Sequence, residues 1–150
     1  MRDTVIPKAQ AADDAGYLLD EQIGFILRQA SQRHAAIFAA GVSGEVTTTQ
    51  WAALAKLHEA GPLSQNLLGR LTVMDAATIK GVIDRLSHRG LTETGLDPDD
   101  RRRRLVSLTE TGRALVVRLK AQALRITEDT LAPLGPEERE ALKLLLLKLR

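Results

Sequence analysis

The sequence predicts a mainly α-helical fold of six helices with one two-stranded β hairpin, and three observations support this prediction. Apolar residues recur at three- and four-residue steps along most of the chain, which is the spacing of one helical face. Capping residues and Gly-Pro breaks divide this pattern into separate helices. After Gly90 the pattern becomes extended around a group of turn-forming residues, which indicates the hairpin.

Length and composition fit a single globular domain over residues 1–150. Hydrophobic residues make up 44% of the chain, charged residues 27%, and there is no cysteine, which excludes disulfides, thiolate metal sites and cysteine nucleophiles. No apolar run approaches the roughly 20 residues that a membrane span needs. We therefore expect a soluble, cytoplasmic protein. The stretch Met1 to Gly16 is expected to be a frayed arm, neither a signal peptide nor an anchor.

Two helices are predicted in the first part of the chain. The first runs from Tyr17 to about Ala40, where apolar residues recur with helical spacing, and glycines follow it. The second begins at a capping box formed by Thr47 and Gln50 and ends at Gly61-Pro62.

The third and fourth helices are expected to be neighbours joined by a tight turn at residues 72–74. Ser64 caps the third helix, which runs through Leu71, and Asp75 caps the fourth, which runs to Gly90. The fourth helix carries an apolar stripe that should face the core: Ile79, Val82, Ile83 and Leu86. Its opposite face is predicted to hold Ala77, Lys80, Gly81, Asp84 and His88.

Two strands and two more helices complete the predicted fold. The strands are 91–94 and 104–108, joined by a loop that contains Gly95 and the turn-forming string Asp97-Pro98-Asp99. Thr109 then caps a helix of about 22 residues that ends before Pro133. Pro136 opens a last helix that is expected to run through Arg150.

The last two helices are too apolar to bury only one face each. The terminal helix carries a stripe of Leu142, Leu145, Leu146 and Leu149, widened by Leu144 and Leu147. The helix before it has Leu115, Leu119 and Ile126 on one side and Val117, Ala121, Leu124 and Leu131 on another. Exposed apolar surface of this extent marks an interface, so we predict a homodimer sealed by residues 17–41 and 111–150. The alternative is a monomeric bundle whose leucines all turn inward.

The order of helix, tight turn, helix and hairpin is that of a winged helix-turn-helix, with residues 47–108 as a DNA-binding core. The fourth helix would enter the major groove, because its first turn is small and its unpaired amides favour phosphate oxygens. Gly81 lies in mid-helix, where glycine is unfavourable unless a close approach requires it. The predicted DNA-binding residues are Ser64, Ala76, Ala77, Thr78, Lys80, Gly81, Arg85, Arg101, Arg102 and Arg103.

Residues 62–112 resemble the winged-helix core of the MarR family of bacterial transcription regulators. The matching strings are Asp84-Arg85-Leu86, Arg89-Gly90-Leu91, Asp97-Pro98-Asp99-Asp100-Arg101-Arg102 and Leu108-Thr109-Glu110-Thr111-Gly112. The flanking helices match in number and order. The chain departs from the family at Gly81, where members often carry a polar or basic side chain. Base readout is therefore expected to rest on Thr78 and Lys80.

Each basic residue also has a simpler explanation. The net charge is only +2, so overall charge does not indicate a nucleic-acid partner. The run Arg101 to Arg104 could be a solvated turn balanced by Asp99 and Asp100. Arg102 is expected to have a mixed role, pairing with Asp100 to stiffen the hairpin while lying near phosphate. Lys80 and Arg85 could be ordinary exposed helix residues, and Asp84 lies at the i+4 position from Lys80, where it can form a helix-stabilising pair.

Two groups of residues suggest a site for a small aromatic carboxylate. The resemblance extends to members that respond to aromatic acids, which implies that Arg28 and His34 on the first helix hold a carboxylate. On the second helix Trp51 and His58 share a face that suits a flat ring. The alternative is that Trp51 is a core residue and that both histidines are hydrogen-bonded core residues. The three histidines lie on three elements without partners at ligand spacing, so we expect neither a metal site nor a cofactor.

The sequence therefore predicts a ligand-responsive repressor that binds a palindromic operator as a homodimer and is released by a small aromatic acid. An enzyme is not expected, because the chain has no Gly-rich phosphate loop, nucleophile elbow or catalytic cysteine. The alternative is a winged-helix module that only contacts proteins and does not bind DNA sequence-specifically.

Overall fold

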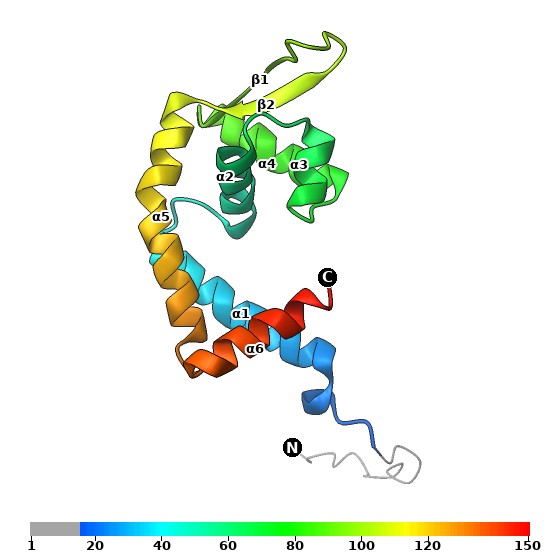
Figure 1. Cartoon of the computed structure of the whole chain (residues 1–150), viewed down its shortest axis with the longest axis vertical. Helices are drawn as coiled ribbons and strands as arrows, with labels where there is room; N and C mark the ends of the chain where they lie inside the picture. The colour runs from blue at the N-terminus through cyan, green and yellow to red at the C-terminus, as the bar shows by residue number, and fades with distance from the viewer. Residues whose placement is uncertain (1–15) are drawn as a thin grey trace, which may run out of the picture. The chain divides into compact units, whose positions relative to one another are not determined.

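The structure, a computed structural model, describes residues 16–150 (Figure 1). The expectation of a frayed N-terminal arm therefore lies outside the described residues, except for Gly16. The chain divides into two compact units, one up to Arg33 and one from His34 onward, and each is described by itself. Within residues 16–150 no helix has the length and apolar character needed to cross a membrane.

The first unit contains a 3-10 turn, η1 (Leu19–Glu21), and the first part of helix α1 (Ile23–Gly41). The α-helix begins at Ile23 and not at the predicted Tyr17, because Gln22 is extended and its side-chain amide donates to the Leu18 carbonyl at 2.8 Å. Large apolar side chains of this unit are exposed: Tyr17, Leu18, Leu19, Ile23, Ile26 and Leu27.

The second unit contains the end of α1, the remaining helices and the hairpin (Figure 1). Its elements after α1 are α2 (Thr48–Ala60), α3 (Gln65–Leu71), α4 (Ala76–His88), β1 (Thr92–Leu96), β2 (Arg104–Leu108), α5 (Glu110–Leu131) and α6 (Pro136–Leu147). These six helices and the antiparallel two-stranded sheet confirm the predicted fold class. One contact was not predicted: Leu63 forms an isolated antiparallel bridge with Val106, which ties the start of α3 to the hairpin.

The predicted starts of α2, α3, α4 and α5 are confirmed by side-chain hydrogen bonds. At α2, Thr47 Oγ1 accepts from the Gln50 amide at 3.2 Å and Gln50 Oε1 accepts from the Thr47 amide at 3.1 Å. Ser64, Asp75 and Thr109 each accept from the amide three residues further on, at 3.3, 2.7 and 3.0 Å. Each bond satisfies an amide that the helix itself leaves unpaired.

Two helix ends differ from the predictions. α4 ends at His88, because Gly90 adopts a left-handed φ of +70° and the Leu91 amide returns to the Leu86 carbonyl at 2.9 Å. With the Gly90 amide bonded to Ser87, this is a Schellman motif, and β1 begins only at Thr92. α6 ends at Leu147 and not at Arg150.

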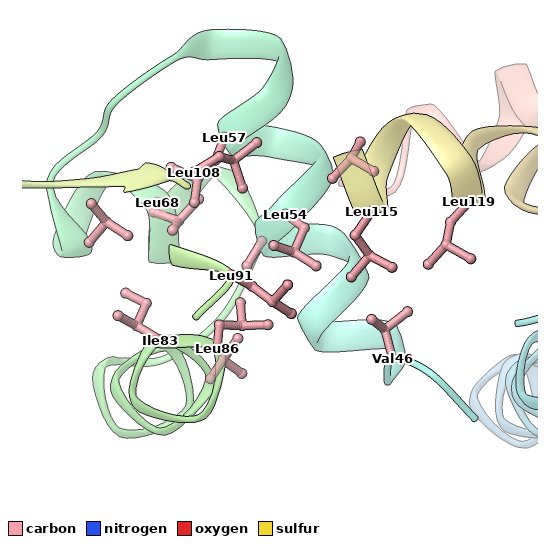
Figure 2. Packing of buried hydrophobic residues seen from close by; sticks show 14 of the residues in the cluster. Val46, Leu54, Leu57, Leu68, Ile83, Leu86, Leu91, Leu108, Leu115 and Leu119 are labelled. Atoms are coloured by element: carbon pink, nitrogen blue, oxygen red, sulfur yellow. The ribbon is translucent and has the colours of Figure 1, made fainter. Parts of the chain in front are cut away.

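The core of the second unit lies between α2, α4 and α5 and the hairpin (Figure 2). Leu54, Leu86 and Leu119 are fully buried there. The predicted stripe of α4 is confirmed, since all four of its apolar residues are buried and its opposite face is not. The core therefore fixes which side of α4 remains available to a partner.

Candidate nucleic-acid interface

The first turn of α4 is small and exposed. Ala76, Ala77 and Thr78 are all exposed, as the predicted groove contact requires. The Asp75 carboxylate caps this turn, and hydrogen bonds from the Thr78 amide and side chain hold the pKa of Asp75 below its ordinary value. The N-terminus of α4 is thus held in place by its own cap.

Further along α4 the predicted contact residues differ in their surroundings. Lys80 Nζ pairs with Asp84 Oδ2 at 2.7 Å, and both side chains are exposed, which confirms the predicted i+4 pair. Arg85 is exposed and lies back along the helix, so that its guanidinium atoms are 3.5 Å from the place that a side chain on Gly81 would take. Gly81 itself is half-buried.

The hairpin presents its arginines at the loop between β1 and β2. Arg101, Arg102 and Arg103 are exposed. The predicted pairing of Arg102 with Asp100 is corrected: Asp100 Oδ1 accepts from the Arg102 backbone amide at 3.0 Å, while the ion pair in this loop joins Arg103 Nε to Asp97 Oδ2 at 3.9 Å. The Asp100 carboxylate does not pair with the Arg102 guanidinium because the aspartates of this loop accept hydrogen bonds from main-chain amides, and these bonds fold the loop.

Asp97 holds this loop in its conformation through hydrogen bonds. Its carboxylate is buried and accepts from the Asp99 amide at 2.9 Å, while its own amide donates to the Arg103 carbonyl at 2.9 Å. The buried acid shapes the loop, and the arginines around it remain at the surface. The loop and the hairpin, called the wing from here on, extend beyond α3 and α4 in Figure 1.

Short contacts fix the base of the wing to the end of α4. The Thr109 hydroxyl donates to the Gly90 carbonyl at 2.6 Å, and the Thr109 amide donates to the Leu91 carbonyl at 3.1 Å. Gly112 on α5 packs directly against Leu91, where a Cβ would overlap the carbonyl oxygen. The exposed face of α4 and the wing therefore belong to one bonded framework.

α3 adds exposed residues that were not predicted to belong to the site. Asn66 and Arg70 are exposed and, with Met74 and Ala76, line a cavity of about 210 Å³ between α3 and α4. Ser64, which was predicted to contact DNA, is half-buried and caps α3. The sequence feature that points to Arg70 is its position beside the predicted tight turn at residues 72–74.

The predicted aromatic-acid residues fall into separate places. Trp51 and His58 line one cavity of about 310 Å³ between α2 and α5, together with Lys120 and Thr127. His34 does not line this cavity: its Nδ1 lies 2.9 Å from Thr130 Oγ1. Arg28 is exposed on α1 in the first unit.

α6 and one side of α5 expose large apolar residues. No residue of α6 is buried, and Leu144 and Leu145 on the helix and Leu149 after its end are well exposed. On α5, Val117 and Leu124 are exposed while Leu115 and Leu119 are buried, which confirms the two faces that the sequence predicted. A groove of about 520 Å³ lies between the end of α5 and α6.

Histidine and carboxylate groups give no sign of a metal centre in the part of the chain that the structure describes. Nowhere in residues 16–150 do three of these side chains gather closely enough to hold an ion.

Comparison with known proteins places this geometry among DNA-binding regulators. The sequence pattern of the MarR family matches residues 46–103, which span α2 to the wing. The repressor NicR of Pseudomonas putida, described as an HTH-type transcriptional repressor, is 39% identical over 144 residues, with 95% of this chain and 91% of NicR covered.

Two solved structures share the fold closely. A probable transcriptional regulator from Pseudomonas aeruginosa is 57% identical with a TM-score of 0.84, covering 89% of this chain and 100% of the other. BpsR of Bordetella bronchiseptica, whose DNA binding is regulated by 6-hydroxynicotinic acid, is 42% identical with a TM-score of 0.84, covering 89% of this chain and 96% of BpsR.

Proposed function

The chain belongs to the MarR family of transcription regulators, and we propose that it is a repressor that binds a palindromic operator as a homodimer and is released by a small aromatic acid. The observation that carries this proposal is the shared framework of α4 and the wing: one exposed helix face and one exposed arginine loop, joined through Thr109. Such a pair suits a major groove and the minor groove beside it.

We assign residues 47–108 to DNA binding and residues 17–41 and 111–150 to dimerisation. Dimerisation is typical of the family, and the exposed leucines of α6 supply an apolar surface for it. Two copies related by a two-fold axis would place their α4 helices in successive major grooves, roughly 10 bp apart. As a regulator that acts on DNA, the protein belongs in the cytoplasm.

The proposed DNA contacts divide into two kinds. The first turn of α4 approaches the groove, and Lys80 and the wing arginines neutralise phosphate or enter the minor groove. Lys80 can exchange its exposed Asp84 partner for a phosphate at little cost, because exposed ion pairs contribute little. The full set is Ser64, Ala76, Ala77, Thr78, Lys80, Gly81, Arg85, Arg101, Arg102 and Arg103.

For the effector we propose an aromatic carboxylate whose ring lies in the α2–α5 cavity beside Trp51 and His58. The regulation of BpsR by 6-hydroxynicotinic acid supports this class of ligand. Arg28 and His34, which the sequence predicts as carboxylate ligands, are kept as separate candidates for that role. The ligand would release DNA only by binding more tightly to a dimer with the wrong spacing of its α4 helices.

Alanine substitutions test the DNA surface. Arg103→Ala and Lys80→Ala should each weaken binding to duplex DNA, because each removes a cation from the proposed surface, while the dimer stays intact. Lys56→Ala is the matched control: it removes the same charge from α2, where Lys56 pairs with Glu59. Fluorescence anisotropy gives the affinities and light scattering the dimer. If both variants bind DNA as tightly as the parent, the assigned surface is wrong.

Thermal shifts test the effector site. A screen of aromatic carboxylates, 6-hydroxynicotinate included, should raise the melting temperature of the parent, and Arg28→Ala and His34→Ala should reduce the shift. Trp51→Leu tests the ring contact separately, because it keeps an apolar side chain. A screen in which no compound shifts the parent would leave the protein without the proposed effector.

A further inference from the structure

Arg85 on α4 has a geometry that the general DNA-binding proposal does not use. Within residues 16–150 no ion pair or hydrogen bond to the Arg85 side chain is formed, whereas Lys80 on the same helix has Asp84 at 2.7 Å. The five guanidinium N–H donors of Arg85 are therefore turned to solvent. A guanidinium that has no partner within residues 16–150 can donate two parallel hydrogen bonds to a pair of coplanar acceptors on a bound partner.

That guanidinium lies beside Gly81. A Cβ built on Gly81 would have Nη1 and Nη2 of Arg85 at 3.5 Å and Cζ at 3.8 Å, and these are its three nearest atoms. Apart from the adjoining residues and the backbone of α4 itself, no core or backbone atom comes as close, so packing against the rest of the chain does not require glycine at this position. Glycine is nevertheless the least favourable helix-interior residue after proline. What the missing side chain leaves is space for the Arg85 head group.

The effect is to move a cation one turn toward the start of α4. Side chains on a helix tilt toward its N-terminus, and the four residues from Gly81 to Arg85 span roughly 6 Å of helix axis. Arg85 and Gly81 are roughly 40° apart around the helix, while Lys80 lies on the opposite flank, roughly 140° from Arg85. The Arg85 head group thus lies over bare backbone on the face that is turned away from the core.

We propose that Arg85 is the residue that determines base specificity on α4, reading a guanine through its O6 and N7 from the space above Gly81. This inference rests on the proposed function, because it needs α4 in a major groove. Guanine is the base that presents two acceptors side by side in that groove, and arginine is the side chain whose donors match them. In a symmetric dimer the same guanine is read once in each half-site.

The alternative for Arg85 is a phosphate contact, which the same experiment separates. A phosphate contact would weaken binding to all sequences about equally, and removing it would lower the salt slope by about one. A base contact instead makes the loss specific to one position in each half-site.

Selection from a duplex library with a randomised centre tests the inference. The parent should enrich a two-fold-related sequence with one guanine required in each half-site. Arg85→Ala should enrich the same sequence with that position open to other bases, a loss of roughly ten- to hundred-fold in discrimination. Arg85→Lys should lose most of the discrimination as well, because an ammonium group cannot donate in the same plane.

Two substitutions at Gly81 supply the matched pair. Gly81→Ala adds a Cβ at an ordinary contact distance from the guanidinium, so it should keep the guanine preference and raise the melting temperature. Gly81→Gln fills the space that the guanidinium occupies, so it should displace Arg85 and lose the preference.

The outcomes distinguish this inference from the function on which it rests. If the parent enriches a sequence and Arg85→Ala enriches it with the guanine still required, the inference is wrong while the function stands. If Arg85→Ala lowers the affinity for every duplex equally, Arg85 contacts phosphate and the inference is also wrong. If the parent enriches no sequence at all, both are wrong.

Discussion

At the scale of single residues, the structure depends on a few close approaches. Gly112 is one of them: the Leu91 carbonyl carbon would lie 2.9 Å from a Cβ at this position, and the oxygen closer still. The neighbouring atoms are backbone and cannot rotate away. Through this contact the start of α5 packs against Leu91, just after the end of α4. The contact therefore also fixes the position of the wing relative to α5.

Gly112→Ala should therefore destabilise the fold by about 1–3 kcal/mol, the usual cost of overpacking a filled site. Urea unfolding measures this loss. Gly24→Ala is the control, because a Cβ on Gly24 meets nothing within 4 Å and alanine is the better helix former. Equal stability of Gly112→Ala and the parent would mean that α5 is not seated against Leu91.

The sequence predicted which residues belong to the site better than it predicted their contacts. The caps Thr47 and Asp75 depend on neighbours three residues away, and their roles were predicted correctly. Asp100 was paired with the wrong atom of Arg102, because the same spacing allows a side-chain or a main-chain bond. The lean of Arg85 over Gly81 depends on a rotamer, which no sequence pattern specifies.

At the scale of elements, the helices are tied together by more than apolar packing. Glu45, in the loop between α1 and α2, forms a bidentate ion pair with Arg118 on α5, with hydrogen bonds of 2.8 and 2.6 Å. This Arg118 hydrogen bond holds the pKa of Glu45 below its ordinary value of 4.5 and raises that of Arg118. The pair lies at the base of the proposed DNA-binding core, where its loss would loosen the loop against α5.

A pH dependence of stability follows from this ion pair. Since the folded protein favours the carboxylate, the contribution of Glu45 is complete above 4.5 and is lost as the pH falls through its lower folded-state pKa. Glu45→Gln should therefore flatten the dependence of the melting temperature on pH below 4.5. Arg118→Gln should flatten this pH dependence to the same extent, and the double variant should flatten it no further. Additive effects of the two variants would contradict the pairing.

Element boundaries show where local sequence rules stop. The start of α5 at Glu110 and its end at Leu131 match the prediction, because Thr109 and Pro133 mark them. The first helix was predicted to begin too early, because the apolar spacing continues through the 3-10 turn at residues 19–21 and spacing alone cannot tell the two helix types apart. The bridge between Leu63 and Val106 joins distant residues, so no local pattern indicates it.

At the scale of the whole molecule, function requires a second copy. The leucines of α6 are exposed to an extent that a monomer does not explain, and two wings are needed to bind a palindrome. Leu145→Asp should therefore shift the protein from dimer to monomer and weaken operator binding, as measured by analytical ultracentrifugation. Leu96→Asp is the control for the oligomeric state alone, since Leu96 on the wing is 63% exposed against 59% for Leu145. A dimer that survives Leu145→Asp would place the interface elsewhere.

We propose that the exposed face of α4 and the arginine wing form one surface that neutralises DNA phosphates. Its most direct test is the slope of log K against log salt concentration, measured on one duplex for the parent and for a variant with Arg101, Arg102 and Arg103 all changed to alanine. We expect a steep slope for the parent, and in the variant a slope smaller by about one for every phosphate that the arginines no longer neutralise. A parent slope near zero, or the same slope in both proteins, would contradict it.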